Sequence, residues 1–517
     1  MTEGKTRPQW GTKLGIILAV AGSAVGLGNF LRFPVQAAQN GGGAFMIPYF
    51  ISFLLLGIPL MWIEWAIGRY GGLFGHGSAP FILNRIWKNR VVKYLGVIGI
   101  FGPVVIFIYY TYIESWLLGY AFFSLTGKLL SIATPEGMKG FLSAYQGLAP
   151  GSNIGTAYVF FLITFLLNFY FLYRGVQGGI ELLCKIAMPI LFIFGFLIAG
   201  RVLTLGVPDL SRPDWNIING LGFLWNPDFS VLFSAKVWMA AAGQIFFTLS
   251  VGIGVILTYA SYLKRGDDVA LSGLTAASTN GMAEVILGGS IVIPVAFAFL
   301  GPVGAAEAAN SGAFNLGFVT MPFIFGRIPF GELFALLWFV LLFLAGITSS
   351  VSLAEPAVAF ISEEFQLDRK KAVLRLGLIL FLLCQFPIFF LGQGVVDELD
   401  FWGGTFALVL FGTIETVLFV WIFGMDKAWD EIHHGAEMRI PGFYKPIIKY
   451  VTPLFLFAIL ISWFIQQGIP VIMMQGVKPE MIPYVLGTRL GLIALLVAIA
   501  LLVRIAWYRR KAEGSVE

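Results

Sequence analysis

The stretch from Ala21 to Arg32 lies inside an apolar run, yet its residues do not suit an ordinary membrane helix. It holds the three glycines Gly22, Gly26 and Gly28, and its polar side chains include Asn29 and Arg32. Each glycine costs a helix about 1 kcal/mol relative to alanine, and an arginine at membrane depth needs water or a partner. A break here would free backbone carbonyls and amides for a ligand, which a membrane tolerates only around a cavity.

A second interruption lies between Gln244 and Gly254, where Gly252-x-Gly254 echoes the Gly-x-Gly of the first stretch. Interrupted helices at corresponding positions of two repeats indicate a substrate site at the membrane midplane. The alternative for Gly22 and Gly26 is close helix packing, because small residues four apart let two helices approach. The repeated Gly-x-Gly pattern, with polar residues beside both sets of glycines, favours a binding site over helix packing.

Oxygen-bearing residues recur at helical spacing in two later runs. Ala345, Thr348 and Ser349 share one helix face, and Asn280 and Glu284 share another. Hydroxyl, amide and freed carbonyl oxygens suit a hard cation such as Na⁺. A single Thr or Ser would more simply bond to its own helix backbone, so the prediction of a sodium site depends on the whole set.

Ile106, Tyr110 and Glu114 follow one another at i+4 spacing. A tyrosine hydroxyl at mid-membrane needs a partner, and a substrate carboxylate at the exposed helix start of Gly28 and Asn29 would be one, because a helix N-terminus favours anions. These groups describe a site for a zwitterion with an apolar side chain.

Ionisable residues inside the apolar runs are few, and each is a functional candidate. They are Arg32, Glu64, Glu114, Glu284, Glu355, Asp400 and Glu415. Arg32 and Asp400 fall at the outer ends of their runs, so we expect them to pair across the cavity mouth as a gate. The alternative is a fixed structural ion pair.

Composition places the chain in the membrane: 517 residues are 58% hydrophobic and 12% charged, with mean hydropathy +0.86. Runs apolar on every side exclude a porin-like barrel. We expect an all-α polytopic protein with twelve transmembrane helices. Their ranges are 12–37, 43–69, 91–124, 157–173, 179–200, 236–262, 271–300, 331–362, 372–391, 399–424, 446–470 and 484–508.

The net charge of +5 reflects membrane topology and not a nucleic-acid surface. Most Lys and Arg residues fall in the loops on the side of the two termini, so the positive-inside rule places both termini in the cytoplasm. Cys184 and Cys384 lie inside spans, where we expect small packed hydrophobes and not a disulfide. His76, His433 and His434 fall in loops, which argues against an intramembrane enzyme.

Two interruptions five helices apart predict inverted five-helix repeats, because an odd number of spans reverses the direction of entry. We expect residues 1–200 to form the first repeat (helices 1–5) and 236–424 the second (helices 6–10), with helices 1 and 6 unwound at mid-membrane. Residues 425–517 would add two peripheral helices, for packing or a homo-oligomer surface, and a cytoplasmic C-terminus.

The chain resembles the neurotransmitter:sodium symporter family over essentially all twelve spans. In Trp10 to Phe45 and Gln244 to Tyr262 it is close to the bacterial, leucine-transporting branch of that family, and Asn40 to Phe45 completes a specific motif. The resemblance implies a bacterial inner-membrane protein with two sodium sites. One would use Ala24, Asn29, Thr248, Asn280 and the substrate carboxylate; the other would use Gly22, Val25, Ala345, Thr348 and Ser349.

The resemblance also implies a substrate pocket and two gates. The pocket residues would be Ala24, Leu27, Gly28, Ile106, Tyr110, Phe247, Thr248, Ser250, Ile253, Ser349 and Leu353. The outer gate would use Arg32 and Asp400 above Tyr110 and Phe247. The inner gate would use Arg7, Trp10, Ser261, Tyr262 and Glu363.

Three positions depart from the family pattern. Glu363 is one methylene longer than the usual aspartate, and Ile106 and Ile253 change the shape of the pocket. Glu284 occupies the place where chloride-dependent relatives bind chloride, so its fixed carboxylate predicts chloride independence.

The sequence thus predicts a sodium-coupled symporter that imports a small neutral, preferentially hydrophobic, amino acid by alternating access. It is not expected to be an enzyme or to bind nucleic acid. The alternatives are an amino-acid sensor or a channel on the same fold. Flux assays discriminate, because only a symporter accumulates substrate against its gradient.

Overall fold

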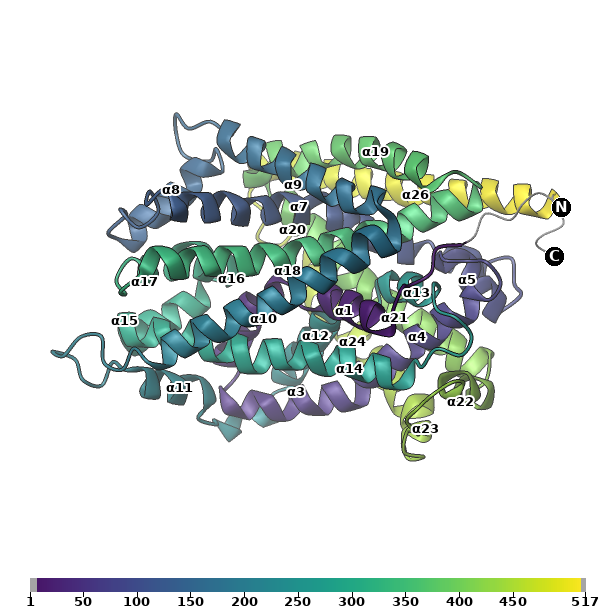
Figure 1. The fold of residues 1–517 in the computed structure, drawn as a ribbon, viewed down its shortest axis with the longest axis horizontal. Coiled ribbons are helices and arrows are strands. Elements are labelled where there is room, and N and C mark those ends of the chain that lie inside the picture. Colours follow the sequence, from purple (N-terminus) through teal and green to yellow (C-terminus); the bar gives the residue numbers. More distant parts are fainter. Residues whose placement is uncertain (1–6, 513–517) are drawn as a thin grey trace.

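The computed structural model describes residues 7–512, which form a bundle of helices (Figure 1). Ten helical stretches in this range are long and apolar enough to cross a membrane. They are Gly43–Gly72 (with α3, Met46–Ser52, and α4, Ile58–Gly72), Val92–Leu125 (with α7, Ile98–Leu125), Gly155–Tyr173 (α9), Val176–Leu203 (with α10, Leu182–Leu203), Ala270–Asn310 (with α14, Ala270–Gly281, and α15, Gly289–Asn310), Gly331–Glu364 (with α18, Gly331–Ala359), Arg369–Phe389 (α19), Val395–Ile422 (with α20, Val395–Leu399, and α21, Ala407–Val417), Tyr444–Ile472 (with α24, Thr452–Trp463) and Pro479–Ala512 (with α26, Ile482–Ala512).

The first expected span is a bent pair of helices. Its halves, α1 (Lys13–Ala24) and Gly28–Gln39, meet at 47°. Val25 leaves the helix with ψ 93°, which turns the chain out of the α conformation. The break is confined to residues 25–27, because helical geometry resumes at Gly28.

The sixth expected span is also divided, into α12 (Ala235–Leu249) and α13 (Val255–Ala260). Ser250, Gly252 and Gly254 between them have φ of 53°, 75° and 79°, in a region that glycine adopts without strain. At Gly252 a Cβ would meet the Leu408 carbonyl, so this glycine is required by close approach as well. The all-helical polytopic fold with breaks in the first and sixth spans is therefore confirmed.

The broken helices lie at the centre of the bundle. Helix α7 packs along α18, and α1 packs against α10, α14 and α18. Cys184 and Cys384 are buried and unpaired, as expected for packed hydrophobic residues.

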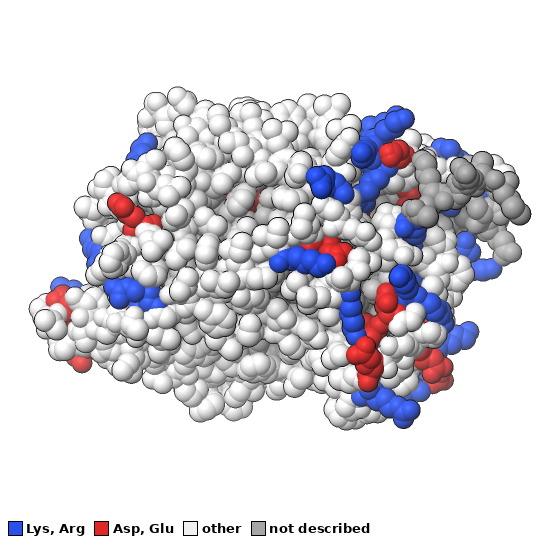
Figure 2. Space-filling model, in the orientation of Figure 1, with Lys and Arg blue, Asp and Glu red and all other residues white. Residues whose placement is uncertain are grey.

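Short helices lie at the two ends of the bundle. The helices α5 (Ala79–Ile86) and α22 (Met425–His433) lie at the end near both chain termini, which we call the terminal end (Figure 1). The helices α8 (Pro135–Tyr145) and α11 (Ile217–Trp225) lie at the opposite end. Charged side chains gather at the terminal end, whereas the middle of the visible face is nearly free of them (Figure 2). This distribution fits a belt of lipid around the middle of the bundle.

Candidate functional site

A central cavity of about 70 Å³ lies where the two helix breaks face α7 and α18. It is lined by all eleven residues predicted for the pocket: Ala24, Leu27, Gly28, Ile106, Tyr110, Phe247, Thr248, Ser250, Ile253, Ser349 and Leu353. The sequence reasoning missed six further lining residues: Ser23, Gly26, Asn29, Tyr109, Gly404 and Leu408. Asn29 was predicted, but only as an ion ligand.

The walls of the cavity combine apolar side chains with a polar rim at the breaks. Ser250 Oγ donates to the Ser23 carbonyl at 2.8 Å, which ties the two breaks together. A Cβ on Gly28 would lie 2.5 Å from the Phe247 ring, so only glycine allows this ring to pack there. The cavity therefore presents backbone and hydroxyl groups on one side and aliphatic groups on the other.

A first cluster of oxygen-bearing groups lies beside the cavity. Asn29 Nδ2 lies 3.2 Å from Thr248 Oγ1, and the amides of Asn29 and Asn280 are 2.7 Å apart. One end of the Asn280 amide lies 2.9 Å from Thr248 Oγ1, and the other lies 3.1 Å from the Ala24 carbonyl. The four predicted ligands of one sodium site thus lie together, with the Thr248 hydroxyl and the Ala24 carbonyl as oxygens of the kind that a hard cation prefers. Asn29 turns its Nδ2 into the cluster, because its Oδ1 accepts from the Gly26 amide at 2.9 Å.

A second cluster joins α1 to α18. Ser349 Oγ lies 3.4 Å from the Gly22 carbonyl and 3.0 Å from the Ala345 carbonyl. Thr348 Oγ1 lies 3.2 Å from the same Ala345 oxygen. Because Val25 has left the helix, its carbonyl is turned away from the helical hydrogen-bond direction. Four of the five groups predicted for the second sodium site therefore lie together, and all four are oxygens: the carbonyls of Gly22 and Ala345 and the hydroxyls of Thr348 and Ser349.

Glu284 is fully buried in the helical segment that connects α14 to α15, and it lies next to the first cluster. Its carboxylate accepts from Tyr49 OH at 2.5 Å and also from the Gln244 side-chain amide. These two donors fix the position of the Glu284 side chain.

The outer gate differs from the expectation. Arg32 lies over the Phe247 ring, 4.4 Å from its centroid, and Asp400 Oδ1 accepts from Tyr109 OH at 2.5 Å. Within the described range, no ion pair joins Arg32 to Asp400. The expected direct pair is thus corrected to two separate contacts, because Tyr109 on α7 reaches the carboxylate and the aromatic face holds the guanidinium.

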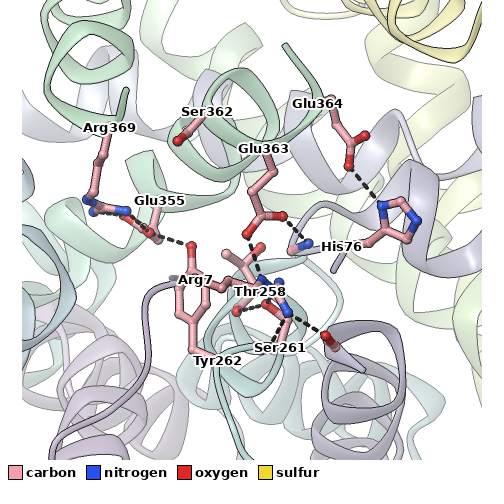
Figure 3. A network of polar contacts seen from close by, with 12 residues as sticks. Arg7, His76, Thr258, Ser261, Tyr262, Glu355, Ser362, Glu363, Glu364 and Arg369 are labelled. Atoms are coloured by element: carbon pink, nitrogen blue, oxygen red, sulfur yellow. Dashed lines mark hydrogen bonds and ion pairs between the residues drawn. The ribbon is translucent and has the colours of Figure 1, made fainter. Parts of the chain in front are cut away.

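The inner gate residues converge at the terminal end (Figure 3). Arg7 Nε lies 3.0 Å from Glu363 Oε1, and Arg7 Nη1 donates to the carbonyls of Gly72 and Ser261 at 2.7 and 2.8 Å. The longer side chain of Glu363 therefore still reaches the arginine. Trp10 Nε1 donates to the Tyr259 carbonyl at 2.8 Å, so the same segment is held at a second point.

A neighbouring part of this network was not predicted from the sequence. Tyr262 OH donates to Glu355 Oε1 at 2.7 Å, and Arg369 binds both Glu355 oxygens at 2.7 and 2.6 Å. His76 Nδ1 lies 3.1 Å from Glu364 Oε1. The only sequence signal for the Glu355 contact was the presence of an acidic residue inside an apolar run.

Two further buried carboxylates support the helix framework. Glu64 Oε1 accepts from the Gly252 amide at 2.5 Å and so caps the second break. Glu114 accepts from Asn168 at 3.3 Å, away from the cavity. Of the i+4 series on α7, Ile106 and Tyr110 face the cavity, and Glu114 binds a neighbouring helix instead.

A multi-pass helical bundle with two broken helices around a central cavity is the architecture of a secondary transporter. Comparisons with known proteins agree. A family model described as the sodium:neurotransmitter symporter family matches residues 7–133 and 139–510. The chain belongs to this family, whose members are sodium-dependent transporters and not enzymes.

Individual relatives match over most of their length. An uncharacterized sodium-dependent transporter of Methanocaldococcus jannaschii is 32% identical over 471 residues, which cover 88% of this chain and 90% of that protein. The sodium-dependent dopamine transporter of Bos taurus is 28% identical over 513 residues, which cover 89% of this chain and 70% of that protein. The crystal structure of MhsT in complex with L-phenylalanine matches with a TM-score of 0.75 and 30% identity, covering 88% of this chain and all of that one (100%).

Proposed function

We propose that this sodium-dependent transporter is a symporter that imports a small neutral, preferentially hydrophobic, amino acid. The observation that carries the proposal is the cavity itself, where amides and hydroxyls at two helix breaks face the aliphatic side chains of Ile106, Ile253 and Leu353. The helix start at Gly28 suits a carboxylate, and the aliphatic wall suits an apolar side chain. The phenylalanine complex of MhsT supports an amino acid as the substrate class.

Two sodium ions are proposed to bind in the two oxygen clusters. The first cluster adjoins the cavity through Ala24 and Thr248, so a substrate carboxylate would complete its ligand set and couple ion and substrate binding. The second cluster bridges α1 and α18, so its occupancy would fix α1 against the rest of the bundle. Each inward charge supplies about 2.3 kcal/mol per 100 mV of membrane potential.

Alternating access would proceed by movement of the broken helices against the remaining bundle. The Arg7–Glu363 ion pair would hold the terminal end closed. The basic loops at that end favour a cytoplasmic location for both termini, in a bacterial inner membrane. Residues 1–200 and 236–424 would act as the two inverted repeats. Residues 425–517 would supply peripheral helices and a surface for a homo-oligomer.

A binding and flux screen tests the proposal. The purified protein is tested with each common amino acid in NaCl and in KCl, first by thermal shift and then for uptake into proteoliposomes. We expect an aliphatic or aromatic neutral amino acid to stabilise the protein in Na⁺ only, and to accumulate against its gradient.

The outcomes separate the alternatives. Binding without uptake would indicate a sensor, and uptake that stops at equal concentrations would indicate a channel. The absence of any Na⁺-dependent ligand among the amino acids would contradict the proposed substrate class.

A further inference from the structure

A second polar cavity, of about 240 Å³, lies at the terminal end between the turn after α5 and the last turn of α26. Four cationic side chains line it: Arg85, Lys88, Arg90 and Lys511. Among the residues that line it within 7–512 there is no Asp or Glu. Of the four cations, Arg90 and Lys511 are the ones that we consider as donors to an anionic ligand.

The turn that carries two of these cations has a defined shape. Asn84 Nδ2 donates to the Asn89 carbonyl at 3.0 Å, and Asn89 Oδ1 accepts from the Val91 amide at 2.9 Å. The Asn89 side chain thus fixes the backbone between Lys88 and Arg90. Such preorganisation lowers the cost of binding.

Further positive charge lies beneath the cavity. Lys93 is buried, with its Nζ 4.1 Å from the centre of the Trp507 ring, which lines the cavity. Arg90, Arg504 and Lys511 are like-charged neighbours of this ammonium group. Like charges at short range repel, and a bound anion would offset this repulsion.

The surroundings of the cavity are exposed and largely apolar. Val91 and Tyr94 are 60% and 37% exposed beside the turn, and Ile505 and Tyr508 are 56% and 60% exposed on α26. Exposed tyrosines next to exposed aliphatic residues are typical of the boundary between headgroups and hydrocarbon. A ligand in this cavity would therefore lie at headgroup depth, with the apolar face of α26 beside it.

We propose that this cavity binds the phosphate headgroup of an anionic phospholipid from the leaflet at the terminal end. Arg90 and Lys511 would bind the phosphate oxygens as charge-assisted donors, and the acyl chains would lie along α26. Basic pockets at a membrane surface recognise lipid headgroups in this way.

The lipid site would adjoin the inner gate. Arg510, next to Lys511, has its Nε 3.1 Å from Glu364 Oε2, and its Nη2 donates to the Glu363 carbonyl at 2.9 Å. The end of α26, which lines the cavity, therefore also contacts Glu363, the residue that pairs with Arg7.

The test measures binding of short-chain phosphatidylglycerol to the purified full chain in neutral detergent, by native mass spectrometry and by titration. The variant carries Arg90→Gln and Lys511→Gln, both at exposed positions. The matched control carries Lys264→Gln and Lys371→Gln, which remove two exposed charges, one from a loop and one from the first turn of α19. We expect about fivefold weaker binding per cation removed, hence about 25-fold for the variant, and a change below about twofold for the control.

Three outcomes would overturn the proposal. The first is unchanged phosphatidylglycerol affinity in the double variant. The second is equal affinity of the native chain for phosphatidylcholine, because the site would then not select an anion. The third is displacement of the lipid by an equal concentration of inorganic phosphate, which would indicate a site for soluble phosphate.

The single variants Arg90→Gln and Lys511→Gln are measured in parallel. They keep the test decisive if the double variant does not fold, because each is expected to weaken binding by about fivefold. Unchanged affinity in both single variants would likewise overturn the proposal.

Discussion

Arg7 Nε lies 3.0 Å from Glu363 Oε1, an ion pair between residues 356 positions apart that fastens the start of the described chain to the end of its eighth span. The arginine also donates to two backbone carbonyls, of Gly72 and Ser261. Four segments that are distant in sequence are thus joined through one side chain. In the proposed transport cycle, opening of the terminal end would break these contacts.

Replacing this arginine should open the terminal end. We expect Arg7→Ala to raise the labelling rate of a cysteine placed at Thr258 by about tenfold, because the closed state loses charge-assisted bonds worth about 1.4 kcal/mol. Labelling with a polar maleimide, in a background without the native cysteines, measures the change. Lys13→Gln is the control: it also removes a cation near the start of the chain, one that pairs with exposed Glu437 at 2.7 Å and lies 4.0 Å from Asp268. Equal rates in Arg7→Ala and the parent would contradict the gate assignment.

Removing one hydroxyl from the second oxygen cluster should weaken sodium binding. We expect Thr348→Ala to raise the Na⁺ concentration for half-maximal stabilisation by about tenfold, because a ligand worth about 1.4 kcal/mol is lost. Thr413→Ala is a matched control: Thr413 is also buried and donates to its own helix, at 2.7 Å to the Val409 carbonyl. If both variants raise the Na⁺ concentration for half-maximal stabilisation by the same factor, the cause is altered helix packing. The second oxygen cluster would then not be an ion site.

Enlarging the cavity should change which substrate is preferred. Ile106→Ala is expected to shift the affinity ratio of phenylalanine to leucine toward phenylalanine by about tenfold, since the methylene groups removed leave room for a ring. Ile108→Ala provides the control, because Ile108 lies two residues along the same helix and lines a different cavity. Competition binding in Na⁺ measures both ratios. A shift of the same size in Ile108→Ala would argue against the assigned pocket.

The fixed carboxylate of Glu284 should make transport independent of chloride. We expect the rate of Na⁺-driven uptake into proteoliposomes to be unchanged when gluconate replaces chloride, because Tyr49 and Gln244 already hold the Glu284 carboxyl group at this position. A strict chloride requirement would refute this role for Glu284.

A side chain at the second break should destabilise the fold. Gly252 has φ of 75°, and an added Cβ would meet the Leu408 carbonyl. Gly252→Ala should therefore cost about 2 kcal/mol or more and lower the midpoint of thermal inactivation in detergent. Gly178→Ala is the control, because a Cβ there meets nothing within 4 Å. A Gly252→Ala protein as stable as this control would show that the backbone here is not constrained.

Much of the fold follows from local sequence. A membrane span needs only about 20 apolar residues in a row, so ten of the twelve expected runs recur as helices of membrane-spanning length, and the first recurs as a bent pair. The sixth expected run is divided into the shorter helices α12 and α13. The helix breaks were equally predictable, because glycines and polar groups within one turn make an unbroken helix costly. Placing all eleven pocket residues additionally required the family resemblance, since spacing alone does not say which helix faces meet.

The sequence by itself determined the spans, the breaks and the chemical types of the ligands, because each of these depends on neighbours within a few turns. Only the tertiary structure decided how the charged groups pair. It joined Asp400 to Tyr109, placed Arg32 over Phe247, and brought Arg369 to Glu355. These partners depend on how helices distant in sequence rotate and pack, and a shift of one helical position would replace one partner with another.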